Sequence, residues 1–252
     1  MGWALRFHGV GNSSAVELGS AMATIERDGQ PWLTIDCGGE GLTAYIAQYG
    51  DYPEALFITH AHLDHVSGLE RLFGANYFAT PRRDSTRLYV PAALVPLLQK
   101  RIAGYPNVVA EGGANFWDAF RVVPVDDAFW HDEVRLQVFP VRHHWPDTAF
   151  GLRLRGSVVW TGDTRPIPEQ LAKFADADEL VAHDCALHGN PSHSGIDDLE
   201  REYPQQLLAR CMLYHYGGDA DAQALAARGK RVARPGDLAP LNEPRALPVD
   251  HT

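Results

Sequence analysis

The chain has 252 residues, of which 45% are hydrophobic and 21% are charged, a composition typical of a globular protein that excludes a disordered or collagen-like chain. Acidic residues outnumber basic residues by 32 to 22, and the resulting formal net charge of −10 argues against a long nucleic acid as partner. A small phosphate ester is still compatible with this charge, because a bound metal ion can supply local positive charge.

The first part of the chain predicts a small antiparallel meander. Short apolar runs alternate with turn formers, and Asp28-Gly29 stands between two such runs, which is a hairpin signal. The apolar positions of 42–49 have helical spacing, and the run 55–58 is short and apolar. We therefore expect a helix followed by a buried strand.

Both periodicities continue through the rest of the chain. We expect further helices over 68–72, 92–102, 168–174 and 221–228. We expect further strands near 76–79, 133–141, 150–155, 158–160, 180–182 and 212–214. This mixture predicts an α/β (α+β) or layered αββα architecture. We expect residues 1–252 to form one domain, with 235–252 as a Pro-rich C-terminal tail that cannot form regular helix or a central strand.

Cysteine usage and the N-terminus predict a cytoplasmic protein. Cys37, Cys185 and Cys211 are too few and too scattered for a disulfide framework or a CxxC zinc site, which favours a reducing compartment. The first ten residues contain no continuous apolar segment, and no run of about 18 apolar residues occurs elsewhere. We therefore expect neither a signal peptide nor a membrane span, and no membrane partner.

Four metal-binding side chains occur within six residues directly after the apolar run 55–58: His60, His62, Asp64 and His65. Imidazole and carboxylate groups are ligands of zinc. His60 and His62 are two residues apart and can point the same way from an extended backbone, whereas Asp64 and His65 follow in a turn and would face a neighbouring site. Two adjacent metal ions are therefore predicted. The alternative is a polar loop that caps the next helix, with Asp64 at its N-terminus.

Further candidate ligands also follow apolar runs. His143 and His144 follow 136–141, Asp163 follows 158–161, and His215 follows 212–214. Each of these alone would be explained as a core histidine or a turn aspartate. The same order of strand and then ligand at four places indicates a metal site.

These ordered motifs resemble those of the metallo-β-lactamase-fold hydrolases, over nearly the whole chain as far as His215. The resemblance implies a four-layer αββα sandwich with two divalent metal ions, which we expect to be Zn²⁺, with Mn²⁺ or Fe as alternatives. It implies that one ion is held by His60, His62 and His143, that the other is held by Asp64, His65 and His215, and that Asp163 bridges them.

The resemblance also bears on the residues around these ligands. We prefer His143 to His144 as ligand, because Pro146-Asp147-Thr148 follows it at the distance found in relatives; His144 would then lie behind the ligands or face the substrate. Asp36, in an Ile-Asp-Cys-Gly segment, is expected to orient a ligand imidazole.

A second group of residues indicates a branch within this fold. Asp184, followed by His188 and by Ser192-His193-Ser194, resembles the acidic residue and the His-Ser pair of tRNase Z and of related cyclic phosphodiesterases, including the one in phosphonate breakdown. A carboxylate that orients an imidazole provides a general acid. We expect Asp184 and His193 to act in this way, with His188 as the alternative acid. The other interpretation is that Asp184 caps a turn and His193 precedes a helix.

The RNA-gripping basic arm of tRNase Z has no counterpart here beyond the short basic patch 99–101. We therefore expect hydrolysis of a small phosphodiester, such as a cyclic nucleotide, by metal-activated hydroxide, with Asp64, Asp184 and His193 as catalytic residues. Arg165 is a candidate contact for a phosphate oxygen. The alternatives are a lactonase or carboxylic-ester hydrolase on the same site, and a metal-dependent sensor or scaffold without turnover. The resemblance also implies a homodimer, as many relatives are dimers.

Overall fold

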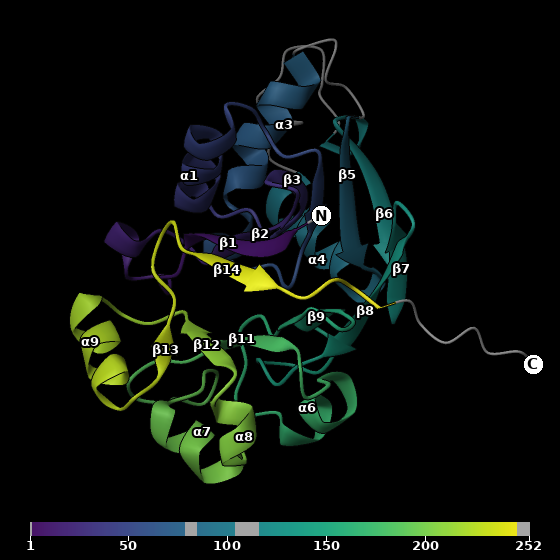
Figure 1. Cartoon of the computed structure of the whole chain (residues 1–252). Coiled ribbons are helices and arrows are strands. Elements are labelled where there is room, and N and C mark those ends of the chain that lie inside the picture. The colour runs from purple at the N-terminus through teal and green to yellow at the C-terminus, as the bar shows by residue number, and fades with distance from the viewer. Residues whose placement is uncertain (1, 79–84, 104–115, 246–252) are drawn as a thin grey trace, which may run out of the picture.

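The computed structural model describes residues 2–78, 85–103 and 116–245. Within these ranges the chain forms two β-sheets that pack face to face, and helices cover their outer sides (Figure 1). Helices α1 and α3 cover the first sheet, whereas α6 to α9 lie on the side of the second sheet (Figure 1). This arrangement is the predicted αββα sandwich.

The first sheet has the strand order β14-β1-β2-β3-β4-β5-β6. Strands β1 to β3 are antiparallel, and β3 to β6 are parallel. The bounds of its strands are β1 Trp3–Gly9, β2 Met22–Arg27, β3 Gln30–Ile35, β4 Ala55–Phe57, β5 Thr86–Pro91, β6 Phe120–Val125 and β14 Leu238–Leu241. The predicted meander and its hairpin are confirmed, with Asp28 and Gly29 both at positive φ in the turn.

The second sheet has the order β13-β12-β11-β10-β9-β8-β7. Strands β10 to β13 are parallel to one another, and β7 to β10 are antiparallel neighbours. Its strands are β7 Ala128–His131, β8 Val134–Pro140, β9 Phe150–Leu154, β10 Val158–Trp160, β11 Leu180–Asp184, β12 Cys211–Tyr214 and β13 Arg231–Val232.

Helices connect these strands. The α-helices are α1 Gly39–Tyr49, α2 Leu63–Val66, α3 Gly68–Phe78, α4 Val95–Leu98, α6 Pro168–Phe174, α7 Ile196–Glu202, α8 Gln205–Leu208 and α9 Asp219–Ala227. Short 3-10 turns cover Val16–Leu18, Ala92–Leu94 and Phe116–Asp118, and a π-helical turn covers Gln99–Ala103. None of the described helices is long and apolar enough to cross a bilayer.

Two buried clusters hold these layers together. The larger cluster fills the space between the sheets, where Phe7 of β1 contacts Trp160 of β10 with ring centroids 5.9 Å apart. The smaller cluster packs α1 and α3 onto the outer face of the first sheet, with Leu42 and Leu69 fully buried. Burial of this apolar area is the main stabilising contribution to a fold of this kind.

Two sequence predictions differ from the structure. A strand near 76–79 is wrong for its described part, because α3 continues through Phe78. The helix expected over 92–102 is instead a succession of a 3-10 turn, the short helix α4 and a π-helical turn. Pro96 at the start of α4 lacks an amide hydrogen and restricts the residue before it, which interrupts a regular helix.

The described part of the Pro-rich tail, 235–245, contains the short strand β14. Strand β14 lies at the edge of the first sheet and pairs antiparallel with β1 (Figure 1). In this pairing Pro240 lies opposite Ala4. Proline is tolerated there because an edge strand does not need all of its amide hydrogens. Residues 246–252 of this tail lie outside the described residues.

Candidate metal centre

Several strands end at the same edge of the sandwich and carry polar residues there. In the first sheet, Asp36 follows β3 and His60 lies three residues beyond β4, its parallel neighbour. In the second sheet, Asp163 and His215 follow β10 and β12, which run parallel through β11. Strand β8 points the same way as β10 because each is antiparallel to β9, so His143 reaches the same edge. The topology therefore brings together residues from 36 to 215.

The first group of side chains meets around Asp163. One ligand atom from each member lies within 4.8 Å of the others, and the members are His60, His62, His143 and Asp163. His60 Nε2 is 3.5 Å from Asp163 Oδ2, and His143 Nε2 is 3.2 Å from His62 Nδ1. The three imidazoles predicted to share one ion therefore converge.

The second group shares Asp163 with the first. Its members also lie within 4.8 Å of one another, and they are Asp64, His65, Asp163 and His215. His65 Nε2 and His215 Nε2 are both 3.2 Å from Asp163 Oδ2 and both 3.6 Å from Asp64 Oδ2. One aspartate thus stands between two groups of ligands.

The chemistry of these groups fits divalent cations. Four buried atoms in the two groups make no hydrogen bond within the described ranges, and they are His60 Nε2, His65 Nε2, His215 Nε2 and Asp163 Oδ1. An unpaired buried polar atom costs about 1–3 kcal/mol, so such a cluster is unfavourable unless something binds it. Imidazole nitrogen and carboxylate oxygen are the donors that zinc and related ions accept.

Asp36 orients His65 from behind. The Nδ1 hydrogen of His65 donates to Asp36 Oδ2 at 2.8 Å, which leaves Nε2 free to face the cluster. The amide of Thr59 donates to the same carboxylate at 2.8 Å. Asp36 adopts a left-handed φ of 64°. Two residues later the backbone passes very close to Asp64, and a Cβ on Gly38 would lie 2.2 Å from the Asp64 carbonyl oxygen, so only glycine fits there.

Hydrogen bonds to the outer nitrogens also hold other ligands. His143 Nδ1 donates to the carbonyl of Ser192 at 3.0 Å, and His60 Nδ1 is 3.0 Å from the Thr59 hydroxyl. Sequence reasoning missed Thr59, and it named Ser192 beside His193 without foreseeing its contact with His143. Their positions next to His60 and His193 were the only available signal, and neither residue type points to such a role.

The electrostatics of the centre follow from burial and from Asp163. Burial lowers the pKa of His60 well below its usual value and that of His143 to about 4. Burial would also lower the pKa of His215, but the carboxylates of Asp163 and Asp184 outweigh it and raise this pKa to about 10. The pKa of Asp163 is well below its usual value, because the surrounding histidines overcome its burial.

Asp184 and His193 form a hydrogen-bonded pair beside the ligands. His193 Nδ1 donates to Asp184 Oδ2 at 2.9 Å, and the amide of Thr164 donates to the same oxygen at 2.8 Å. Burial lowers the pKa of His193, but the bond to Asp184 outweighs it and the pKa is raised. The His193 ring stacks 4.9 Å from that of His215. Asp184 and His193, together with Asp163 and His215, form a third group whose possible ligand atoms lie within 4.8 Å of one another.

The remaining candidate residues lie at the margin of the metal centre. His144 is exposed beside the centre, with its ring centroid 4.8 Å from that of His62, so it borders the ligands rather than joining the first group. His188 is exposed, and the hydrogen bond to Asp184 is made by His193 instead. Arg165 is exposed on the loop after Asp163.

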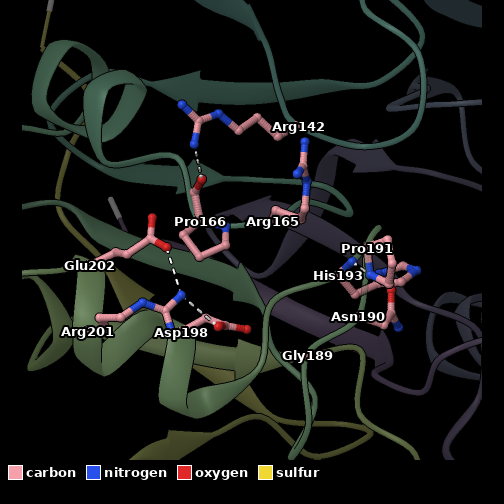
Figure 2. Close-up of a pocket in the computed structure, with 10 residues that line it drawn as sticks. All are labelled: Arg142, Arg165, Pro166, Gly189, Asn190, Pro191, His193, Asp198, Arg201 and Glu202. Carbon is pink, nitrogen blue, oxygen red and sulfur yellow. Dashed lines mark hydrogen bonds and ion pairs between the residues drawn. The ribbon is translucent and has the colours of Figure 1, made fainter.

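Three hollows lie at or beside the centre. One, of about 260 Å³, opens onto Asp64, Asp163 and His215 and is bordered by the loop 12–14. A second, of about 400 Å³, lies beyond His193, and Figure 2 shows Arg142, Arg165 and Arg201 around it. In this view Arg142 donates to Pro166 and Arg201 bonds Asp198 and Glu202 (Figure 2). A third hollow, of about 660 Å³, borders His60, His62 and His143. A small molecule can therefore reach the ligands from more than one side.

Known proteins resemble this chain in sequence and in fold. The profile of the family described as "Anti-Pycsar protein Apyc1" matches residues 3–238. The Anti-Pycsar protein Apyc1 of Saccharibacillus brassicae is 30% identical over 238 residues, which cover 90% of this chain and 94% of the relative.

Two solved structures show the fold. The metallo-β-lactamase fold protein YhfI from Bacillus subtilis has a TM-score of 0.73 at 14% identity, and covers 95% of this chain and 100% of its own. A diphosphatase from the PhnP family has a TM-score of 0.74 at 17% identity, and covers 95% of this chain and 97% of its own. The metallo-β-lactamase fold expected from the motifs is confirmed.

Proposed function

The chain belongs to the Anti-Pycsar protein Apyc1 family, and from this premise we propose that it is a metal-dependent hydrolase of a small phosphodiester, with a cyclic nucleotide as the substrate class. One observation supports this proposal above the others. Two groups of ligands share Asp163, and the hydrogen-bonded pair Asp184 and His193 lies against them. In metal-dependent hydrolysis of a phosphodiester, two cations activate water and stabilise the charge on phosphate, and an adjacent proton donor protonates the leaving group.

We propose that the two groups hold two divalent cations, with Zn²⁺ as the expected ion. His60, His62 and His143 would bind one cation, Asp64, His65 and His215 would bind the other, and Asp163 would lie between them. Bound there, the cations would act as Lewis acids that polarise phosphate oxygens and lower the pKa of water.

The protein side chains would supply the proton for the leaving group. The Asp184 carboxylate can only accept hydrogen bonds at neutral pH. His193 therefore donates its Nδ1 hydrogen to Asp184, and its Nε2 points away from this carboxylate. The raised pKa of His193 favours the protonated ring, in which Nε2 can donate to the departing alkoxide. Attack of water on phosphorus then breaks one P–O bond. In a cyclic diester this yields a single monoester product.

The acidic chain also supports a small substrate. Its net charge of −10 disfavours a long polynucleotide, and the arginines beyond His193 are largely paired with Asp198, Glu202 and Glu169. We therefore propose a small-molecule partner rather than RNA.

The test is hydrolysis of bis(p-nitrophenyl) phosphate, cyclic nucleotides and lactones by metal-loaded protein. We expect turnover of the diesters, abolished in His62→Ala and retained in His188→Ala, which removes an exposed histidine outside both ligand groups. Turnover of lactones alone would instead identify a lactonase. Absence of any turnover with metal bound would contradict the proposal and favour a sensor or scaffold.

A further inference from the structure

The largest of the three hollows carries side chains that the proposed reaction does not use. Besides three of the candidate ligands, it is lined by Leu97, Trp145, Lys100 and Arg101. Trp145 is 80% exposed and Leu97 is 41% exposed. Both side chains therefore offer apolar surface inside the hollow that a ligand can cover.

The loop that bears Trp145 is held in a defined conformation. Its base is closed by hydrogen bonds from Val141 to the Ala149 carbonyl at 3.1 Å and from Phe150 to the Thr59 carbonyl at 2.9 Å. The Thr148 hydroxyl donates to the Trp145 carbonyl at 2.6 Å. Two non-glycine residues of this loop, His144 and Asp147, have left-handed φ values of 57° and 59°, a strained backbone that persists only where the surroundings impose it.

The charge of this hollow differs from that of the chain. The chain has a net charge of −10, yet the described residues that line the hollow include Lys100 and Arg101 and no carboxylate. A cationic, aromatic wall favours an anionic ligand that also has a flat ring. The same wall would repel the cationic parts of a protein partner.

We infer that Trp145, together with Lys100 and Arg101, forms a subsite for the base of a nucleotide whose phosphate lies at the metal centre. This inference rests on the proposed function, because it assigns the part of the substrate that does not react. The indole of Trp145 would stack on the base, and the positive charges of Lys100 and Arg101 would attract the anionic nucleotide into the hollow. Trp145 is then a specificity-determining residue.

The experiment separates recognition of the ring from recognition of the charge. Binding of adenosine 5′-monophosphate and of ribose 5-phosphate is measured by calorimetry for wild type, Trp145→Ala, Trp145→Phe and a Lys100→Ala/Arg101→Ala double variant. The matched control is Trp130→Ala, which removes a tryptophan that is 63% exposed on β7, outside this hollow.

We expect Trp145→Ala to raise the ratio of the two dissociation constants, that of the nucleotide over that of the sugar phosphate, roughly ten- to hundredfold. Trp145→Phe keeps an aromatic ring, and its ratio should stay near the wild-type value. The double variant should weaken both ligands and reduce the salt dependence of binding. Trp130→Ala should change neither constant.

Three outcomes would decide against the inference or separate it from the proposed function. An unchanged ratio in Trp145→Ala, in a protein that hydrolyses diesters, would overturn the subsite and leave the function standing. Nucleotide binding that depends on Trp145 without any hydrolysis would support the subsite and contradict the function. Conversion of a dimer to a monomer in Trp145→Ala, with the ratio unchanged, would show that a second copy covers the tryptophan.

Discussion

Two buried residues of the metal centre have an unusual backbone conformation. Asp36 and His215 have positive φ values of 64° and 69°, and both are buried non-glycine residues. Such a conformation is unfavourable for an L-residue and is retained where neighbouring contacts impose it. His215 has its backbone amide bonded to the Val10 carbonyl at 2.6 Å, which turns its side chain toward Asp163 and Asp64. Individual residues are therefore strained in order to face the centre.

Replacement of His193 tests the proposed proton donor. In His193→Gln we expect kcat for a diester with an alkoxide leaving group to fall about 10²- to 10⁴-fold, because the departing oxygen lacks a proton donor. Hydrolysis of bis(p-nitrophenyl) phosphate should fall much less, since p-nitrophenolate leaves without protonation. Steady-state kinetics on both substrates give the comparison. Equal losses on the two would indicate that His193 holds the structure or a metal ion instead.

A buried histidine outside the ligand groups predicts a pH dependence of stability. Burial lowers the pKa of His8 to about 3, and its ring is hydrogen-bonded to the Thr24 hydroxyl at 2.8 Å. In the unfolded chain this pKa returns to about 6.5. Below pH 6.5 the unfolded state therefore binds a proton that the folded state does not, and stability falls as the pH decreases toward 3.

Urea unfolding at pH 7.5 and pH 5.0 measures this effect. From pH 7.5 to pH 5.0, the free energy of unfolding should decrease in wild type by about 2 kcal/mol more than it decreases in His8→Gln. His188→Gln, which changes an exposed histidine, should behave as wild type. The same loss in wild type and His8→Gln would refute the assignment.

Elements of the second sheet are joined by a buried ion pair. Arg153 of β9 donates through Nε and Nη2 to the carboxylate of Glu179, just before β11, at distances of 2.6–3.1 Å. The amide of Gly156, in the turn between β9 and β10, donates to Glu179 at 2.6 Å. One carboxylate just before β11 therefore links that strand to β9 and to the turn that follows β9, and both Arg153 and Glu179 are at most 5% exposed.

Replacement of Glu179 should destabilise these elements strongly. We expect Glu179→Gln to lower the free energy of unfolding by about 3 kcal/mol, because it leaves the Arg153 charge buried without its main partner. Asp219→Asn, which breaks the exposed pair with Arg234, should cost less than about 1 kcal/mol. Denaturant unfolding of both variants provides the test, and equal effects would mean that burial does not matter here.

The sequence patterns of the elements were informative where local and tertiary preferences agree. The hairpin at Asp28-Gly29 and the helix over 42–49 depend on turn chemistry and periodicity that are local. The strand expected near 76–79 failed because Asn76 lies within α3, where its buried amide donates to the Thr86 hydroxyl at 2.9 Å and to the Ala119 carbonyl at 3.3 Å. Contacts from residues 10 and 43 positions away are invisible to a local pattern.

At the scale of the whole molecule, the proposed cations would connect the two sheets. His60, His62, Asp64 and His65 follow β4 of the first sheet, whereas His143, Asp163 and His215 follow strands of the second. A ligand that binds only the folded state stabilises it by mass action, by about 4 kcal/mol at a thousandfold excess over its dissociation constant. The metal centre should therefore stabilise the entire sandwich.

Removal of metal tests this coupling. We expect a chelator to lower the melting temperature of wild type by several degrees, with metal content followed by elemental analysis. Asp163→Asn, which alters the residue shared by both groups, should bind less metal and respond little to the chelator. A melting temperature unaffected by loss of metal would contradict a centre that joins the sheets.

The sequence by itself determined the residue types of the site and their order. A His-x-His-x-Asp-His segment after an apolar run, with later His and Asp residues after other runs, predicted the candidate ligands, and its resemblance to the metallo-β-lactamase-fold hydrolases predicted the fold. Only the tertiary structure placed His143, and not His144, in one group with His60, His62 and Asp163, and only it showed that His193, and not His188, is hydrogen-bonded to Asp184. These choices depend on where a loop side chain points. That direction is set by contacts such as the bond from His143 to Ser192, which are distant in sequence.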